Sequence, residues 1–298
     1  MPEKHFLEEN RKTIMARGKK IAFQGVPGAY SHLACSAVKP EAETLACSSF
    51  SEMILSVQQG KADFAMVPVE NSTAGRVADI HHILPESGLY IIGEHYQPVE
   101  HKLLAIKGAK LTDITEVHSH EQGLAQCRKS LEKLGIRPVI HADTAGAAKD
   151  IALLGDPNTG AIASALAAEI YGLNILDADI LDSNTNTTRF LIMAPKPKVP
   201  TDISLPAITT LIFEVRSVPA VLYKALGGFA TNGINLTKIE SYMKGGSMQA
   251  AQFYIDCEGH VQSEAMIRAL EELRFYCKDE GVQILGTYPA SPSRQIAR

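Results

Sequence analysis

From Lys20 onward, short apolar runs alternate with segments of helical periodicity, and few folds accommodate such a pattern. Strands that alternate with helices indicate βα units and a largely parallel sheet. In the first series the apolar runs lie at 21–25, 43–48, 64–69 and 89–94. Helices are expected between them, near residue 31, at 50–59 and from residue 76 to the residue before Pro85. This part of the chain is therefore predicted to be of α/β class.

A second series repeats the rhythm. Its strands are predicted at 99–106, 115–119, 137–142 and 160–164, and its helices at 121–134, 144–154 and 165–171. One more buried strand, TRFLIMA (188–194), follows. Two series and a returning strand predict a two-lobed module over 20–196, with a cleft between lobe 1 (20–98 plus 186–196) and lobe 2 (99–185).

The segment PKPKVPTDISLP contains four prolines and no periodicity, which predicts an extended linker at 197–206. Beyond it the order strand, helix, strand, strand, helix, strand predicts a βαββαβ ferredoxin-like domain over 207–290. In that domain a turn is expected at Gly245-Gly246, and Pro219 is expected in the first turn of a helix. Residues 1–19 are interpreted as an N-terminal extension and 291–298 as a tail.

Charge and composition exclude several classes of function. The 29 Lys and Arg residues are scattered among 33 Asp and Glu residues, so nucleic acid is not an expected partner. No stretch approaches the ~18 apolar residues of a membrane-spanning helix. The charged N-terminus lacks the apolar core of a secretory signal, so we expect a cytoplasmic protein. Five cysteines without a C-x-x-C pair indicate neither a disulfide framework nor a zinc site.

Four segments carry polar groups at predicted strand ends. The first, FQGVPGAYSHLA (23–34), places a turn before a helix whose expected N-cap is Ser31. A helix N-terminus suits a carboxylate or phosphate. Gly25 and Gly28 do not complete a dinucleotide fingerprint, and a capped helix after a tight turn is the plain alternative.

The second segment, VPVENSTAGRV (67–77), brings Asn71, Ser72 and Thr73 to the end of an apolar strand. Ligands of open α/β sheets bind at the carboxyl ends of strands, so these side chains are candidate binding residues. A solvated, self-capped turn is the alternative.

The third segment, VHSHEQGLAQC (117–127), again runs from strand to helix. Ser119 and Gln122 have the spacing of a capping box, and Gln126 lies one turn beyond Gln122 on the same helical face. His118 and His120 are interpreted as surface residues, because no metal-ligand spacing accompanies them.

The fourth segment, NTNTTRF (184–190), is a polar run that enters an apolar strand. Arg189 is unusual there, because a buried Arg normally has an anionic partner. That partner is either a bound anion or an acidic side chain of the module itself. The chain has neither a G-x-S-x-G elbow nor an H-E-x-x-H site. Its chemistry is therefore expected to use hydroxyls, amides and backbone dipoles.

In order and spacing, the four segments resemble the motifs of prephenate dehydratases, and the resemblance spans about 20–289. It implies decarboxylation and dehydration of prephenate to phenylpyruvate on a fold similar to periplasmic binding proteins, without a metal or organic cofactor. The family's essential threonine falls on Thr188, and its active-site asparagine, serine and glutamine fall on Asn71, Ser119 and Gln126. Substrate contacts are further expected from Ser31, Ser72, Thr73, Gln122, Arg189 and Phe190.

The reaction that the resemblance implies agrees with this set of polar groups. Loss of CO2 makes the ring aromatic, so the protein mainly has to help the ring hydroxyl leave. Thr188 is expected to donate to that oxygen in a dry, preorganised site. The two substrate carboxylates are expected at the helix N-termini near Ser31 and 72–75 and at Arg189. Closure of the lobes would exclude water.

The C-terminal domain resembles the ACT domain that binds L-phenylalanine in this family. The family's P-G-A-L and E-S-R-P read Pro219-Ala220-Val221-Leu222 and Glu240-Ser241-Tyr242-Met243 here. The missing Gly and Arg-Pro argue against tight phenylalanine binding, whereas the turn at 233–236 is retained. Expected effector contacts are Ala220, Val221, Leu222, Asn232, Asn235, Leu236, Glu240 and Ser241.

The resemblance further implies a homo-dimer or homo-tetramer paired through ACT domains, with phenylalanine as effector. Two alternatives stay open. One is arogenate dehydration, since arogenate differs only by an amine in place of a keto group. The other is a catalytically silent amino-acid sensor.

Overall fold

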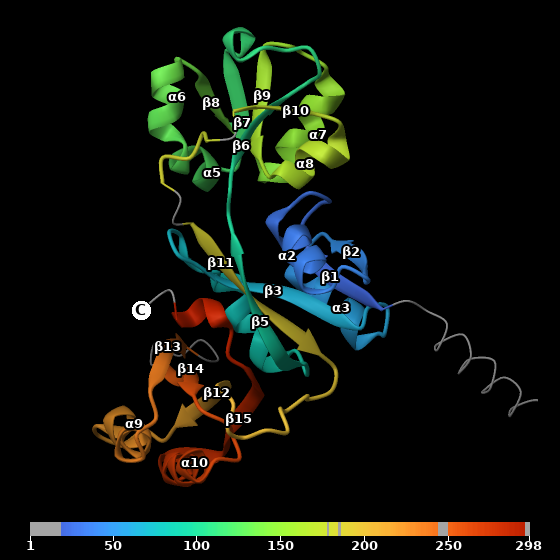
Figure 1. Ribbon diagram of the computed structural model, residues 1–298. Coiled ribbons are helices and arrows are strands. Elements are labelled where there is room, and N and C mark those ends of the chain that lie inside the picture. The colour runs from blue at the N-terminus through green and yellow to red at the C-terminus, as the bar shows by residue number, and fades with distance from the viewer. Residues whose placement is uncertain (1–18, 178, 184–185, 244–249, 296–298) are drawn as a thin grey trace, which may run out of the picture. The chain divides into compact units, whose positions relative to one another are not determined.

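The computed structural model describes residues 19–177, 179–183, 186–243 and 250–295 (Figure 1). The chain divides into two compact units, which are described separately below. The first unit takes in the chain up to Met66 together with Glu100–Asn184, and the second takes in Val67–Val99 with the chain from Thr185 onward. This division cuts through the predicted lobe 1. The expected turn at Gly245-Gly246 and nearly all of the expected N-terminal extension lie outside the described residues.

The N-terminal part of the first unit is a set of parallel strands with two helices. Strands β1 (Lys20–Gln24) and β2 (Glu43–Cys47) pair in parallel, and β1 also pairs in parallel with the start of β3 (Phe64–Asn71). Helices α2 (Tyr30–Val38) and α3 (Phe50–Gln58) follow β1 and β2. These βα units confirm the expected rhythm.

The second part of the first unit is a five-stranded sheet of order β10-β6-β9-β7-β8. Its strands are β6 (Lys102–Ala105), β7 (Glu116–Ser119), β8 (Arg137–Ile140), β9 (Thr159–Ala163) and β10 (Asn174–Asp177). Its helices are η2 (Leu111–Asp113), α5 (Glu121–Gln126), α6 (Arg128–Leu134), α7 (Thr144–Leu154) and α8 (Ala165–Tyr171).

Two sequence predictions need correction in this sheet. Strand β7 is parallel to β8 and β9, but β6 is antiparallel to β9 and β10, so the sheet is mixed and not largely parallel. The single helix predicted at 121–134 is broken at Cys127, whose φ of −114° ends α5 and caps α6. The Cys127 side chain is fully buried in the core of this part.

The second unit begins with the rest of β3, the short β4 (Gly75–Arg76), α4 (Ala78–Ile83) and η1 (Leu84–Glu86). Strand β5 (Tyr90–Pro98) pairs antiparallel with β11 (Thr187–Ala194), from Thr187 opposite Pro98 to Ala194 opposite Tyr90. The strand order of the first sheet is β2-β1-β3-β11-β5, so β11 is the neighbour of both β3 and β5.

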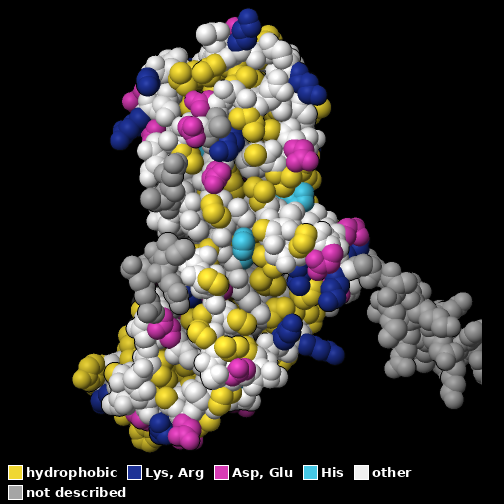
Figure 2. All heavy atoms as spheres, viewed as in Figure 1, with side chains coloured by type: hydrophobic (Ala, Val, Ile, Leu, Met, Phe, Trp, Pro, Cys, Tyr) yellow, Lys and Arg dark blue, Asp and Glu magenta, His cyan; other side chains and the backbone are white. Residues whose placement is uncertain are grey.

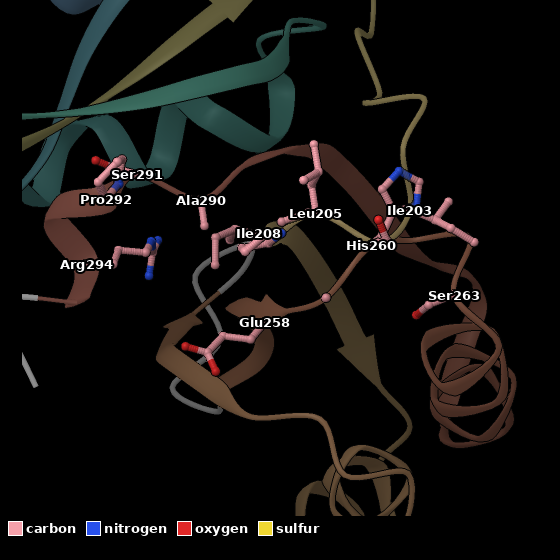
Figure 3. A pocket seen from close by; sticks show the side chains of 14 residues that line it. Ile203, Leu205, Ile208, Glu258, His260, Ser263, Ala290, Ser291, Pro292 and Arg294 are labelled. Atoms are coloured by element: carbon pink, nitrogen blue, oxygen red, sulfur yellow. The ribbon is translucent and has the colours of Figure 1, made fainter.

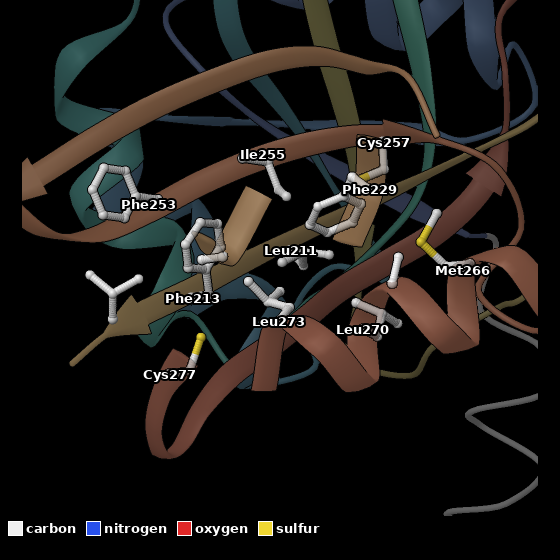
Figure 4. Close-up of a cluster of buried hydrophobic side chains, with 13 residues drawn as sticks. Leu211, Phe213, Phe229, Phe253, Ile255, Cys257, Met266, Leu270, Leu273 and Cys277 are labelled. Carbon is white, nitrogen blue, oxygen red and sulfur yellow. The ribbon is translucent and has the colours of Figure 1, made fainter. Parts of the chain in front are cut away.

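The C-terminal domain of the second unit has the predicted ferredoxin-like topology. Its antiparallel sheet has the order β13-β14-β12-β15. The strands are β12 (Ala207–Val215), β13 (Leu236–Met243), β14 (Ala250–Glu258) and β15 (Cys277–Pro289). Helices α9 (Val221–Thr231) and α10 (Glu264–Tyr276) close one apolar core with residues such as Phe213, Phe229 and Leu270 (Figure 4).

Two features of this domain differ from expectation. Helix α9 starts at Val221 after an N-cap at Ala220, so Pro219 precedes the first turn and does not occupy it. Part of the predicted tail is ordered as η3 (Pro292–Gln295).

On the face shown in Figure 2, Lys and Arg side chains are interspersed with Asp and Glu. No helix among the described residues is long and apolar enough to cross a membrane.

Candidate active site

The ends of β3 and β11 bring Asn71 and Thr188 together. The Asn71 side-chain amide donates to Thr188 Oγ1 at 2.9 Å and to Asn186 Oδ1 at 2.6 Å. Each of these strands is hydrogen-bonded to a neighbouring strand on both sides, which restrains its backbone. A hydroxyl that accepts a hydrogen bond still holds its own proton for donation. Thr188 is therefore oriented by Asn71 and remains a donor.

The loop after β3 fixes the Asn71 side chain from its other end. Asn71 Oδ1 accepts hydrogen bonds from Thr73 N, Thr73 Oγ1 and Ala74 N, which forms an Asx turn. Ser72 Oγ accepts from Thr187 N at 2.9 Å, and Ser72 N donates to Thr187 O. The Ser72 and Thr73 hydroxyls thus take part in holding the loop against β11, as the self-capped alternative expected. Their predicted substrate contacts stay a prediction.

Arg189 faces away from Thr188, because successive strand residues point to opposite faces. Its guanidinium is buried and donates to Glu94 at 2.9 Å, Glu70 at 2.8 Å, Asp256 at 2.6 Å and the Tyr288 hydroxyl at 3.1 Å. These contacts favour the salt-bridge alternative over a substrate cation. Two of the partners, Asp256 and Tyr288, belong to the C-terminal domain. Phe190 is 1% exposed and packs in the core.

The charged side chains around Arg189 stabilise one another's ionised forms. Burial acts to raise the pKa of the Asp256 carboxyl, but the Arg189 guanidinium and the Thr210 hydroxyl outweigh it, so the pKa is lowered overall. The pKa of Glu70 is also lowered, since Arg189 and Lys238 outweigh its burial. Burial acts to lower the pKa of Arg189, and the Asp256 carboxylate reverses this. Asp256, Glu70 and Arg189 are therefore ionised at neutral pH.

A cavity of about 800 Å³ adjoins the ends of β3 and β11 within the second unit. Its lining includes Asn71, Ser72, Tyr96, Thr187, Arg189 and Lys238. Burial raises the pKa of Tyr96 to about 12, so this phenol remains a hydrogen-bond donor at neutral pH.

The third motif lies in the first unit, and there the predicted capping box is wrong. The N-cap of α5 is His120, whose Nδ1 accepts from Gln122 N at 3.3 Å. Ser119 is fully buried, and its hydroxyl donates to Ile162 O at 2.6 Å because β7 lies next to β9. Gln122 is exposed at the start of α5, and Gln126 is half-buried at its end.

Sequence reasoning missed His101, which lies between Gln126 and Tyr30. The His101 ring is 3% exposed, hydrogen-bonds to the Gln126 side chain, and has Nδ1 3.0 Å from the Tyr30 hydroxyl. Burial lowers the pKa of His101 to about 4, although the Gln126 hydrogen bond acts to raise it. A neutral imidazole at neutral pH donates from one ring nitrogen and accepts at the other. The available signal was a histidine at the start of an apolar strand.

The first motif forms the turn that was predicted, but with a different cap. The N-cap of α2 is Ala29, which has no side-chain capping bond, and Ser31 lies in the first turn. Gly28 has φ of +90°, and an added Cβ would lie 2.8 Å from Ala167 Cα, so both the turn and the close packing require glycine. Gly28 N donates to His32 Nδ1, and Ser164 Oγ donates to Gly28 O.

The expected effector residues fall at two ends of the C-terminal sheet. Leu236 pairs with Cys257, which pairs with Thr209 near the start of β12. Ser241 pairs with Phe253, which pairs with Phe213 near the end of β12. Asn232 and Asn235 therefore group with Leu236, whereas Glu240 groups with Ser241 and with Ala220, Val221 and Leu222, which follow β12. A single copy of the domain does not bring the two groups together.

Several of these residues already have partners. Asn232 Nδ2 donates to Gly228 O at 2.8 Å, and its Oδ1 accepts from Arg268 Nε at 3.0 Å, so Asn232 ties α9 to α10. Glu240 pairs with Arg76 at 3.3 Å. Val221, Leu222 and Leu236 pack against the domain core.

A second cavity, of about 600 Å³, lies in the C-terminal domain at the end of the linker. Ile203, Leu205, Glu258, His260 and Arg294 line it (Figure 3). His260 Nε2 is 2.9 Å from Pro200 O, which fastens the linker to the domain. None of the expected effector residues lines this cavity.

Within the described ranges, no three or more His, Cys, Asp or Glu side chains are arranged to hold a metal ion. All five cysteines are buried free thiols. The second unit offers hydroxyls, amides and paired carboxylates, and the first unit offers a neutral imidazole and an amide. Such groups can orient an anion, donate to a leaving oxygen and exclude water.

Comparison with known proteins agrees with this chemistry. The model of the prephenate dehydratase family matches residues 21–198. A Komagataeibacter europaeus protein named bifunctional N-acyl-homoserine lactone acylase/prephenate dehydratase is 49% identical, over 92% of this chain and 97% of its own. Arogenate dehydratase/prephenate dehydratase 1 of Arabidopsis thaliana is 40% identical, over 91% of this chain and 72% of its own.

Among solved structures, the Arthrobacter aurescens prephenate dehydratase in complex with L-Phe has a TM-score of 0.81 and 30% identity. The match covers 91% of this chain and 90% of that one. The family match, the relatives and the fold agree, and the chain belongs to the prephenate dehydratase family, the lyases that decarboxylate and dehydrate prephenate.

Proposed function

We propose that this chain converts prephenate to phenylpyruvate, with Thr188 as the donor to the departing ring hydroxyl. The observation that carries the proposal is the hydrogen bond from Asn71 to Thr188, which joins two motifs 117 residues apart in the sequence. That bond fixes the direction of the Thr188 hydroxyl and leaves its proton for the substrate.

The reaction needs little more than such a donor. The bond from the ring to its carboxylate breaks, and its electron pair enters the ring. The carbon–oxygen bond of the ring hydroxyl breaks, and the oxygen leaves as water after receiving a proton. An aliphatic hydroxyl is a weak acid. Thr188 therefore acts chiefly by hydrogen-bonding the oxygen as negative charge develops on it.

In the first unit, we assign Gln126 to the substrate together with His101, which orients it. When Nε2–H of a neutral His101 donates to the Gln126 carbonyl oxygen, the orientation of the Gln126 amide is fixed, and its NH2 group is the donor that we assign to a substrate carboxylate. The Tyr30 hydroxyl then donates to His101 Nδ1. Support for this tautomer comes from the low pKa of His101 and its two hydrogen bonds.

The test is steady-state turnover of prephenate, measured as phenylpyruvate formed. Thr188→Ala is expected to lower kcat by about 10²–10³, the scale for loss of one preorganised donor. The control is Thr112→Ala, which truncates an exposed threonine of η2 and is expected to stay within about threefold. Unchanged turnover in Thr188→Ala would refute the role of Thr188. No phenylpyruvate from the unaltered protein would favour a silent amino-acid sensor.

We favour prephenate over arogenate because the family model and the K. europaeus relative both name prephenate. The Arabidopsis relative names both substrates, so arogenate remains the competing one. Turnover of the two compounds should be compared at equal concentration. A kcat/KM for arogenate above that for prephenate would reverse the assignment.

We also propose that the C-terminal domain is an ACT domain, and that L-phenylalanine binds where two copies of it pair. Support comes from the ferredoxin-like topology, the L-Phe complex of the A. aurescens relative, and the placement of the two residue groups at opposite ends of one domain. Both groups could touch one ligand only if a second copy supplied one of them. Calorimetry with L-phenylalanine, combined with sedimentation, tests this; a monomer that binds phenylalanine contradicts it.

Hydrolysis of N-acyl-homoserine lactones is the second candidate, favoured by 49% identity to a protein whose name includes that acylase activity. All five thiols are buried, so a cysteine nucleophile is not offered. Release of homoserine lactone should be measured in the unaltered protein and in Thr188→Ala. If Thr188→Ala loses both the acylase and the dehydratase activity, the two reactions take place in one site.

A further inference from the structure

The two strands that carry Asn71 and Thr188 have a second pair of contacts on their opposite face. Glu70 precedes Asn71, Arg189 follows Thr188, and Arg189 Nη1 donates to Glu70 Oε1 at 2.8 Å. On the other face, Asn71 Nδ2 donates to Thr188 Oγ1 at 2.9 Å. In addition to the backbone pairing of these neighbouring strands, two side-chain bonds therefore join β3 and β11 at this point, one on each face.

In the C-terminal domain, Asp256 bonds to Arg189, the same residue that donates to Glu70. This carboxylate is fully buried on β14 and accepts from Arg189 Nη1 at 2.6 Å. Its other oxygen accepts from Thr210 on β12 at 2.6 Å. Tyr288 on β15 accepts from Arg189 Nη2 at 3.1 Å and is 2.8 Å from the Thr210 hydroxyl. Three strands of the C-terminal sheet thus converge on one guanidinium.

Two further cations of the C-terminal region join the cluster. Lys238 Nζ lies 2.6 Å from Glu70 Oε2, and Arg294 contacts both oxygens of Glu94, at 2.6 and 2.8 Å. Glu94 on β5 also accepts from Arg189 Nε. Arg189, Lys238 and Arg294 therefore contact Glu70, Glu94 and Asp256. Lys238 also lies 3.6 Å from Glu240, which pairs with Arg76, so four cations meet four carboxylates. Because the charges balance, loss of one member leaves a buried partner uncompensated.

We propose that Asp256 is a positioning residue for the dehydration step, acting through Arg189 to keep Thr188 in contact with Asn71. The inference rests on the proposed role of Thr188. It makes the C-terminal domain part of the support of the active site, in addition to any effector site that it carries. A displacement of β11 by a fraction of an ångström would lengthen the bond between Asn71 and Thr188, and catalysis is sensitive to displacements on this scale.

The test is a double-mutant cycle on kcat. Asp256→Asn keeps the size of the side chain and removes the charge, and it is expected to lower kcat about tenfold or more. In a Thr188→Ala background the same change is expected to cost less than about twofold, because residues that act as a unit are non-additive. A purely structural role would lower kcat by the same factor in both backgrounds, and that result overturns the proposal.

The matched control is Thr287→Val, on strand β15 opposite Thr209 of β12. Thr287 is buried, and its hydroxyl lies 3.0 Å from Thr209 Oγ1, but no hydrogen bond links it to Arg189. This variant is expected to lose stability and keep kcat within about twofold. If Asp256→Asn is not recovered folded, Tyr288→Phe takes its place in the cycle, with an expected loss of about threefold that vanishes in the Thr188→Ala background.

The single variants separate the two proposals. Normal kcat in Asp256→Asn together with a large loss in Thr188→Ala refutes the positioning role and leaves the proposed function standing. Normal kcat in Thr188→Ala refutes the proposed function itself.

Discussion

Ala220, at the N-terminus of α9, holds a backbone conformation that suits glycine. Its φ of 55° and ψ of 25° lie in the left-handed region, and Ala220 and Glu280 are the two non-glycine residues with positive φ among the described residues. An L-residue with a Cβ pays about 1–2 kcal/mol in this region. Ala220 also stands where the resemblance to the family placed a glycine, so Ala220→Gly should remove strain.

The expected size of the effect is the difference of two terms. Relief of strain contributes about 1–2 kcal/mol, and the extra freedom of glycine in the unfolded chain costs about 0.4–1 kcal/mol. Ala220 is exposed, so no packing is lost. We therefore expect Ala220→Gly to raise the free energy of unfolding by about 0.5–1 kcal/mol, measured by chemical denaturation followed by circular dichroism.

Ala230→Gly provides the matched control, because Ala230 is an exposed residue inside α9. Glycine in a helix costs about 0.5–1 kcal/mol relative to alanine, so the same substitution should lower stability there. Opposite signs at the two positions would support the argument from backbone conformation. A loss of stability in both variants would refute it. If phenylalanine binds at this end of the domain, Ala220→Gly should also tighten that binding.

Two further predictions concern residues of the proposed site. Burial keeps His101 neutral in the folded chain, whereas a histidine in the unfolded chain binds a proton below pH about 6.5. The free energy of unfolding should therefore fall by about 3 kcal/mol as the pH is lowered from 6.5 to 4. The His101→Gln variant should lose this part of the pH dependence. An identical pH profile in His101→Gln would contradict this. Asn71→Ala removes the donor to Thr188 Oγ1 and the acceptor of the Asx turn. This variant should lower kcat for prephenate at least tenfold, with a smaller change in KM. A change in KM alone would make Asn71 a binding residue only.

The division into βα units and the ferredoxin-like order of the C-terminal domain followed from the sequence alone. Each depends on short-range patterns, since hydrophobic periodicity and the placement of proline determine local structure directly. Capping was less predictable: Ser31 and Ser119 were expected to cap helices, but Ala29 and His120 hold those positions. Several polar residues near a strand end can each serve as a cap, and the path of the loop selects among them.

The partners of the site residues were decided by tertiary structure. The sequence marked Arg189 as a buried cation with an unknown anionic partner, and it offered no means of choosing Asp256, which lies 67 residues away. The sequence likewise did not indicate that His101 contacts Tyr30, which lies 71 residues earlier. Periodicity assigns a side chain to a face of its own strand or helix. Only the packing of distant strands determines which charges and hydrogen bonds meet on that face, because burial makes an unpaired group costly.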